Sequence, residues 1–140
     1  MYEVELKLPS DPKLLKIIRC SVAHLCEISG FSNDDKNSVI LAVDEAASNI
    51  IKHAYGNRKD QPMLIRCRLL DDRVEIVLRD FGEKPDPDKI KPRDLEEVKP
   101  GGLGVHFIQS CMDVVRYEED AEKGNRLTLI KYLSGRKERK

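Results

Sequence analysis

The sequence predicts a single α+β domain: a two-layer sandwich in which a largely antiparallel sheet carries helices on one face. A chain of 140 residues can bury one core but has little room for a second. Strand-like alternation occurs near both ends of the chain and in its middle, and two long segments with helical periodicity follow the first strand. We therefore treat residues 1–140 as one domain.

The first part of the chain predicts one strand and two helices. Residues 2–8 alternate between apolar and charged side chains, the period of a half-buried strand. Asp11 can cap a helix whose apolar repeat ends at Gly30. Ser32 can cap a second helix with acidic residues in its first turn, and the apolar stripe of that helix continues to Ala54.

The second part predicts four strands, a short helix and a loop. Residues 83–100 hold four prolines and many charged side chains, which predicts an exposed, mobile loop. A short helix is expected through residues 105–111, after a glycine-rich turn. A polar Asp-Asp-Arg turn joins the predicted strands at residues 63–70 and 74–78 as a hairpin. The predicted strands are residues 63–70, 74–78, 113–117 and 126–132.

Composition indicates a cytosolic protein with neither a nucleic acid nor a membrane as partner. Lys plus Arg and Asp plus Glu each number 25, whereas nucleic-acid binders usually carry a basic excess. No apolar run approaches the roughly 20 residues that cross a bilayer, and the amino terminus lacks the features of a secretory signal. The four cysteines have no spacing typical of a zinc site, so we expect reduced thiols.

A polar row on the second helix could carry chemistry. Glu45, Asn49 and Lys52 are spaced four and three residues apart, so a regular helix places them on one face. They combine a carboxylate that can take a proton, an amide oxygen that can bind a hard cation, and a cation for phosphate. The same row is also what the solvated face of any amphipathic helix contains.

Asp80-Phe81-Gly82 follows the strand at residues 74–78. A carboxylate that leaves a sheet there can accept a hydrogen bond from an exocyclic amine such as that of adenine. Taken alone, the motif is more commonly an ordinary turn at a strand end. The short chain lacks the other signatures of bilobal protein kinases, so that analogy fails.

Gly101-Gly102-Leu103-Gly104 stands directly before a predicted helix. Without side chains, the backbone N–H groups and the positive end of the helix can approach a phosphate. The turn matches neither a Rossmann fingerprint nor a P-loop. A flexible entry into the helix is the alternative.

The three motifs together resemble, in order and spacing, the N box and the two glycine boxes of the GHKL ATPase superfamily. The stretch Leu-Ala-Val-Asp-Glu-Ala-Ala-Ser-Asn and the ending at residues 124–128 look most like the anti-sigma serine kinases of the RsbW and SpoIIAB type. The resemblance covers nearly the whole chain. It implies the Bergerat ATP-binding fold, with a mixed, mostly antiparallel sheet.

By motif position, the resemblance implies a role for individual residues. Glu45 is the implied general base, and Asn49 the ligand of an Mg²⁺ that bridges the phosphates of ATP or ADP. Asp80 is implied to hold the adenine amino group, with Gly82 flanking the base. The other implied nucleotide contacts are the phosphate-binding Gly102, Leu103 and Gly104 and, as weaker candidates, Lys52, His53 and Thr128.

The loop between the glycine boxes is a lid over the nucleotide in the family, so the resemblance implies a lid at residues 83–100. Lys84 stands where the fuller motif Asp-x-Gly-x-Gly has its second glycine. We therefore expect ATP binding to be retained and lid geometry and nucleotide exchange to be affected. His24 lacks the sequence setting of a sensor kinase hairpin, so autophosphorylation on histidine is not expected.

The resemblance implies an ATP-dependent serine/threonine protein kinase that is also an anti-sigma factor. In that scheme it binds a sigma factor until an unphosphorylated anti-anti-sigma protein of the STAS type displaces it, and phosphorylation then releases the antagonist. Family members commonly form homodimers. The alternatives are a nucleotide-dependent protein-binding module without significant kinase activity and the ATP-binding fragment of a split histidine kinase. Glu45 favours the kinase, because binding alone requires no base.

Overall fold

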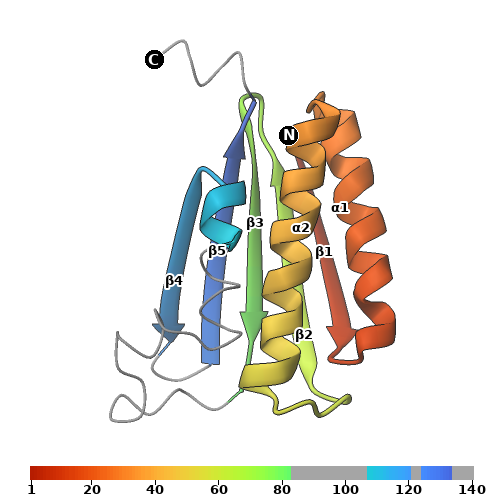
Figure 1. Cartoon of the computed structure of the whole chain (residues 1–140), viewed down its shortest axis with the longest axis vertical. Helices are drawn as coiled ribbons and strands as arrows, with labels where there is room; N and C mark the ends of the chain where they lie inside the picture. Colours follow the sequence, from red (N-terminus) through yellow and green to blue (C-terminus); the bar gives the residue numbers. More distant parts are fainter. Residues whose placement is uncertain (83–106, 121–123, 134–140) are drawn as a thin grey trace.

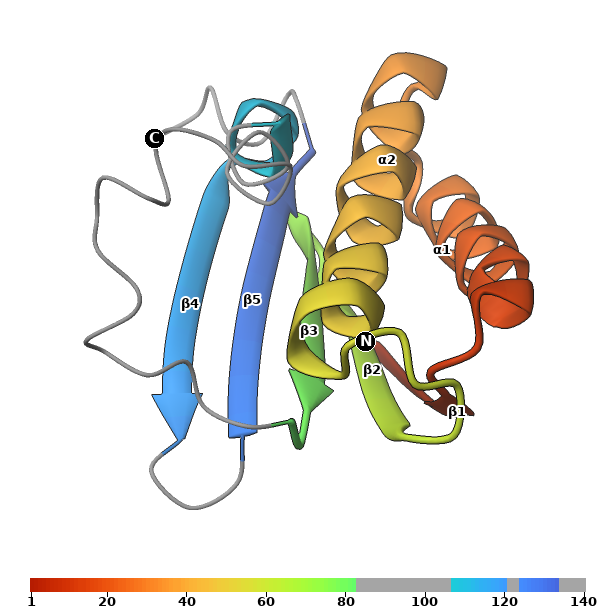
Figure 2. The same ribbon diagram turned by 60° about the horizontal axis from the view of Figure 1, so that its bottom comes forward.

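The computed structural model describes residues 1–82, 107–120 and 124–133. Its helices cover one face of a sheet (Figure 1), and the turned view separates the two layers (Figure 2). The predicted α+β class is confirmed. The predicted loop at residues 83–100 and the glycine-rich turn at residues 101–104 lie outside the described residues.

The described strands form a five-stranded sheet in the order β1-β2-β3-β5-β4. All four pairings between these strands are antiparallel. Because β3 and β5 run antiparallel, the start of β5 pairs with the end of β3. The strands are β1 (Tyr2–Pro9), β2 (Pro62–Leu69), β3 (Arg73–Asp80), β4 (Val114–Asp120) and β5 (Gly124–Tyr132).

The two long helices begin close to the residues that the sequence indicates, and the first ends at the predicted Gly30. A short 3₁₀ turn, η1 (Pro12–Leu14), precedes α1 (Leu15–Ser29), and α2 (Asn33–Asn49) follows. The Ser32 side chain accepts a hydrogen bond from the Asp35 backbone N–H at 3.1 Å, which caps α2. No helix in the described ranges is long and apolar enough to cross a membrane.

The second helix differs from its prediction at its carboxyl end. Residues Ile50–Ala54 form a π-helical turn, η2, instead of continuing α2 as a regular helix. The Tyr55 N–H donates to the Ile50 carbonyl, five residues back, at 3.0 Å. Periodicity could not reveal this turn, because Ile50 and Ile51 face the core in either geometry. Single π turns inside α-helices are frequent at functional sites.

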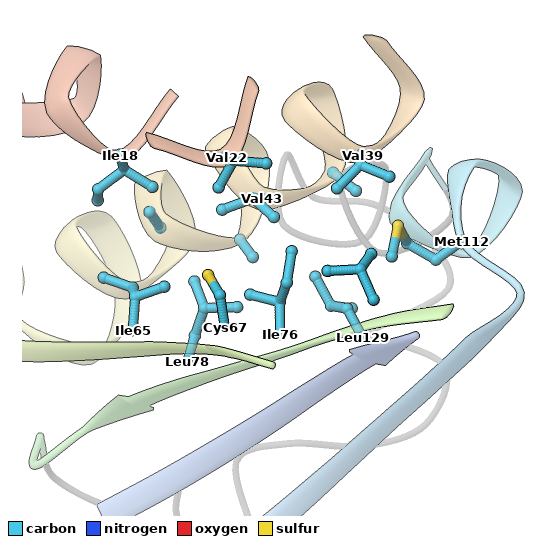
Figure 3. Close-up of a cluster of buried hydrophobic side chains, with 14 of the residues drawn as sticks. Ile18, Val22, Val39, Val43, Ile65, Cys67, Ile76, Leu78, Met112 and Leu129 are labelled. Carbon is cyan, nitrogen blue, oxygen red and sulfur yellow. The ribbon is translucent and has the colours of Figure 1, made fainter. Parts of the chain in front are cut away.

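The core lies between the helices and the covered face of the sheet (Figure 3). Each fully buried aliphatic side chain there contributes about 1.5–3 kcal/mol to folding. The packing therefore fixes α2 and η2 against β3, where the motif residues lie. Side chains no more than 1% exposed include those from α1 (Ile18, Val22), α2 (Val39, Val43), β2 (Ile65, Cys67), β3 (Ile76, Leu78) and β5 (Leu129).

Candidate functional site

Asp80 is the last residue of β3 and lies on the face of the sheet that the helices cover. Its side chain is buried, with the residue 4% exposed. Its Oδ1 accepts hydrogen bonds from the Gly82 backbone N–H and from Nδ2 of Asn125, both at 3.0 Å. Within the described residues Oδ2 has no hydrogen-bond partner, so one carboxylate oxygen can still accept a bond from a ligand.

Burial raises the pKa of Asp80 above its ordinary value, because a charged carboxylate is desolvated there. The hydrogen bonds from Gly82 and Asn125 and the charge of Arg79 act in the opposite direction. Without these donors, the buried charge would be more costly still. The arrangement provides a buried acceptor of fixed orientation at the edge of the core.

Tyr55 connects the end of η2 to this corner of the sheet. It is 1% exposed, and its hydroxyl donates to the Pro62 carbonyl at 2.6 Å. The same hydroxyl accepts the Phe81 backbone N–H at 2.6 Å. Burial raises the pKa of Tyr55, so the hydroxyl stays protonated and can donate. One side chain therefore fixes both the start of β2 and the turn after Asp80.

Two glycines allow the backbones of this corner to approach closely. A Cβ on Gly82 would lie 2.4 Å from the backbone oxygen of Ala54, the last residue of η2. A Cβ on Gly124 would lie 2.1 Å from the backbone oxygen of Asp80, and Gly124 has a φ of +91°. The turn after β3 therefore packs directly on the end of η2, with no side chain between them.

Glu45 and Asn49 are both half-buried on α2. In the described part of the chain, neither side chain forms a hydrogen bond or an ion pair. Their neighbour Asp44 differs, because Arg19 of α1 donates to its Oδ1 at 2.9 Å. Asn49 ends α2 and directly precedes η2, whose last residue, Ala54, meets the turn at Gly82. The polar row thus leads towards the Asp80 corner.

Comparison with known proteins identifies the family of the chain. The family model described as "Histidine kinase-like ATPase domain" matches residues 8–131. The chain belongs to this family. A histidine kinase-like ATPase domain binds ATP, so the predicted ATP binding is supported at the level of the family.

Named relatives refine the comparison. The protein called "Serine-protein kinase RsbW" in Staphylococcus epidermidis is 32% identical, with 93% of this chain and 86% of that protein covered. The protein of the same name in Bacillus subtilis (strain 168) is 30% identical, with 94% and 86% covered. The predicted resemblance to the RsbW type is confirmed.

A solved structure is similar in fold. The histidine kinase domain of the blue-light activated histidine kinase from Erythrobacter litoralis EL346 superposes with a TM-score of 0.59. The match covers 93% of this chain and 64% of that chain at 16% sequence identity. At this identity the likeness shows the fold alone.

The structure brings together some of the predicted site residues of this ATPase domain and separates others. Asp80 and Gly82 meet the end of η2, while Lys52 and His53 are exposed on the π turn. The predicted phosphate-binding residues Gly102, Leu103 and Gly104, and the departure at Lys84, lie outside the described residues.

Thr128 does not reach the Asp80 corner. It pairs with Val77 across β3 and β5, whereas Asp80 pairs with Asn125. Side chains alternate between the two faces of a strand, so Thr128 and Asn125 lie on opposite faces of the sheet. The sequence could not reveal this, because β3 and β5 are not consecutive and no hairpin turn fixes their register.

Sequence reasoning missed Asn125 and Tyr55 as neighbours of Asp80. Asn125 lies within the ending at residues 124–128, and neither residue type has chemistry that demands a site by itself. Their role follows from their place: one lies opposite Asp80 in the neighbouring strand, and the other bonds the following residue. Only the β3–β5 register identifies Asn125 as the neighbour of Asp80, and that register is not contained in the local sequence pattern.

Proposed function

We propose that this chain is an ATP-dependent protein-serine kinase of the RsbW type, which transfers the γ-phosphoryl group of ATP to a serine of a protein partner. The observation that carries the proposal is the buried Asp80 carboxylate, with two donors on Oδ1 and none on Oδ2 among the described residues. Family membership and the name that the relatives share support the reaction type.

Asp80 recognises the base in this proposal. Its free Oδ2 accepts a hydrogen bond from the exocyclic amine of adenine. The absence of a side chain at Gly82 keeps the turn close to Ala54 and leaves the adjacent face of the base uncovered. The base would therefore lie next to the junction between η2 and the end of β3.

The phosphates extend along α2 in the proposal. Asn49 can offer its amide oxygen to Mg²⁺, and Glu45, one turn away, can orient or deprotonate the serine hydroxyl. When bound with the nucleotide, Mg²⁺ offsets the negative charge of the phosphates. The described residues contain no group of three or more His, Cys, Asp or Glu side chains suited to a metal. A single amide oxygen fits a cation held mainly by phosphates and water.

The second glycine box completes the phosphate contacts. Gly102, Leu103 and Gly104 would donate backbone N–H groups, and residues 83–100 would close over the nucleotide as a lid. Lys52 and His53 are exposed cationic or donor groups on the π turn η2, and they could contact the phosphates from the solvent side. Thr128 is left out of the proposed site because it lies on the other face of the sheet.

The partners follow from the resemblance to RsbW-type kinases. We propose that the serine belongs to an anti-anti-sigma protein of the STAS type, and that a sigma factor competes with it for this chain. A homodimer is the proposed assembly. The cytosol is the proposed compartment, because ATP is available there and the four cysteines are free thiols.

The test is phosphoryl transfer from ATP and Mg²⁺ to a STAS-type antagonist encoded in the same genome. We expect the antagonist to gain the mass of one phosphoryl group. The modification should be stable in acid, as phosphoserine is. Glu45→Gln should slow transfer by about 10²–10⁴-fold, the usual contribution of a general base, with little change in ATP affinity. Asp44→Asn is the matched control, because Asp44 is the adjacent acid but is paired with Arg19.

Two outcomes would contradict the proposal. ATP binding without phosphoserine formation on any STAS-type antagonist from the same genome would indicate a nucleotide-dependent binding module. Acid-labile phosphohistidine as the main product would indicate a split histidine kinase. Unchanged transfer in Glu45→Gln would remove Glu45 as the base.

A further inference from the structure

We propose that Lys131 is a positioning residue for the phosphates of ATP, because it anchors the short helix at residues 107–111. This inference rests on the proposed function, in which the glycine-rich turn that precedes this helix in the sequence binds the phosphates. It assigns a role to a residue of β5 that belongs to none of the motifs. Lys131 also lies at the other end of the β3–β5 pairing from Asp80.

Lys131 is a cation on the apolar side of the sheet. It pairs with Val74, which is 1% exposed, so its side chain lies on the face that the helices cover. Only 15% of that side chain is exposed. An ammonium group in such a layer costs free energy unless it is paired. An apolar residue would fill the same place without this cost, so the lysine calls for an explanation.

The ammonium group of Lys131 has two partners. Its Nζ donates to the backbone carbonyl of Cys111, the last residue of the short helix, at 2.9 Å. The same Nζ lies 4.0 Å from Oδ1 of Asp35 in the first turn of α2. A cation at the carboxyl end of a helix binds carbonyls that have no partner inside the helix and interacts favourably with the helix dipole. The lysine thus connects the short helix, α2 and β5.

The chain is fixed to β5 at the place where it leaves the short helix. The Asp113 N–H donates to the Ile130 carbonyl at 2.9 Å, and Oδ2 of Asp113 accepts the Tyr132 N–H at 2.8 Å. Lys131 stands between these two residues, so three consecutive residues of β5 hold the carboxyl end of the helix. Because the helix is short, an anchor at this end also restricts where the helix begins, three residues after Gly104.

The short helix needs such an anchor. Isolated helices of fewer than about 12 residues are marginal in water, so tertiary contacts must hold this one. Ile108, Cys111 and Met112 are all buried, and Met112 is part of the core shown in Figure 3. Apolar burial is non-directional, so these contacts attach one side of the helix without fixing its position along its axis. The hydrogen bond from Lys131 to the last carbonyl supplies that direction.

A displaced helix would disturb the phosphate contacts and leave the base contacts in place. In the proposed function the base lies at Asp80, whereas the turn that leads into the short helix binds the phosphates. Loss of the Lys131 anchor should therefore weaken nucleotide binding only through the phosphates. Adenosine has the base and the ribose but no phosphate, so its affinity reports the base contacts separately.

The first test is hydrogen exchange of the nucleotide-free protein. Lys131→Met fills the apolar layer without a donor, and replacing a buried ion pair by apolar groups is often neutral for global stability. Peptides that cover residues 107–113 report the hydrogen-bonded N–H groups of Met112 and Asp113. Their protection should fall about tenfold in Lys131→Met, as the loss of one hydrogen bond from a charged group implies. The shorter, uncharged Lys131→Gln decides the matter if Lys131→Met fails to fold.

The second test compares the Kd of ATP with Mg²⁺, measured by calorimetry, with the Kd of adenosine, measured by displacement of ATP. In the Lys131 variants the affinity for ATP should fall about tenfold relative to that for adenosine, because the same hydrogen bond is lost. Lys36→Met is the matched control. The Lys36 side chain is 19% exposed and also lies near the start of α2, but its hydrogen bond goes to Glu27 of α1. This control should match the wild type in both tests.

Wild-type protection and a wild-type ratio of the two affinities in the Lys131 variants would overturn the inference. Lower protection with an unchanged ratio would also overturn it, because Lys131 would then be a structural anchor without effect on the phosphates. Equal losses of ATP and adenosine affinity, or the same losses in Lys36→Met, would do so as well. If the folded wild type bound no ATP, the proposed function would fail and this inference with it. The inference fails alone only when the wild type binds ATP, so the two failures are distinguishable.

Discussion

At the scale of one residue, Asp80 shows that a site can include a group whose burial lowers the stability of the fold. Its carboxylate is buried, and burial of a charge costs free energy that hydrogen bonds offset only in part. The balance is visible in the raised pKa, for which desolvation is the largest cause. A residue retained under such a cost is a reasonable candidate for function, as perturbed groups often are.

The raised pKa predicts how stability depends on pH. Between the ordinary value of 3.8 and its higher folded value, Asp80 takes up a proton on folding. The free energy of unfolding that this group contributes is therefore lost as pH rises through that window. Urea denaturation of wild type and Asp80→Asn across this range should show the variant gaining stability relative to the wild type as pH rises.

Asp72→Asn is the control for this experiment. Asp72 lies in the hairpin at the other end of β3, is exposed to about a third and pairs with Arg73. Its substitution should not reproduce the trend. A difference between wild type and Asp80→Asn that stays constant with pH would contradict the raised pKa.

At the scale of elements, sequence patterns predicted most of the structure but missed what decides the site. The alternation at residues 2–8 and the caps at Asp11 and Ser32 correspond to β1, η1 and α2. These signals are local, so one segment is enough to read them. The π turn η2 and the β3–β5 register depend on contacts with distant segments, and no local pattern contains them.

The π turn should depend on Tyr55 for its connection to the sheet. Tyr55→Phe keeps the ring but removes the hydroxyl that accepts the Phe81 N–H and donates to the Pro62 carbonyl. The unfolding free energy should fall by about 1–3 kcal/mol, because a buried donor is left without a partner. Urea denaturation measures this loss, and ATP affinity should fall as well, since Phe81 follows Asp80.

Tyr2→Phe provides the matched control, because Tyr2 is 64% exposed. Its stability should stay within about 0.5 kcal/mol of the wild type, as surface substitutions usually do. Equal stability of Tyr55→Phe and the wild type would show that water replaces the hydroxyl. The proposed link between η2 and the turn after β3 would then be wrong.

At the scale of the whole molecule, three motifs distant in sequence predicted one site, and the fold brings part of it together. The end of η2, the end of β3 and the start of β5 meet at Asp80. Glu45 and Asn49 lie on the helix that leads there, so the spacing of the motifs was informative. Their roles, and those of Gly102 and Gly104, stay predictions.

The division between the two layers also bears on the prediction at Thr128. A strand that is read from sequence has two faces, and only its neighbours decide which face the helices cover. Register with β3 places Asn125 on the covered face and Thr128 on the other. Periodicity places Leu127 and Leu129 on one face and Thr128 on the other, but it does not say which face the helices cover. The pairing of β5 with β3 in the folded molecule is what places Asn125, and not Thr128, beside Asp80.

The central claim is that the corner at Asp80 binds the base of ATP. Calorimetric titration of the folded protein with ATP and Mg²⁺ tests it most directly, with Asp80→Ala beside Asp72→Ala as the matched acidic control. The account predicts saturable binding by the wild type and by Asp72→Ala, and at least a tenfold weaker affinity for Asp80→Ala, about 1.4 kcal/mol. Equal affinities of all three proteins, or no binding by the folded wild type, would contradict it.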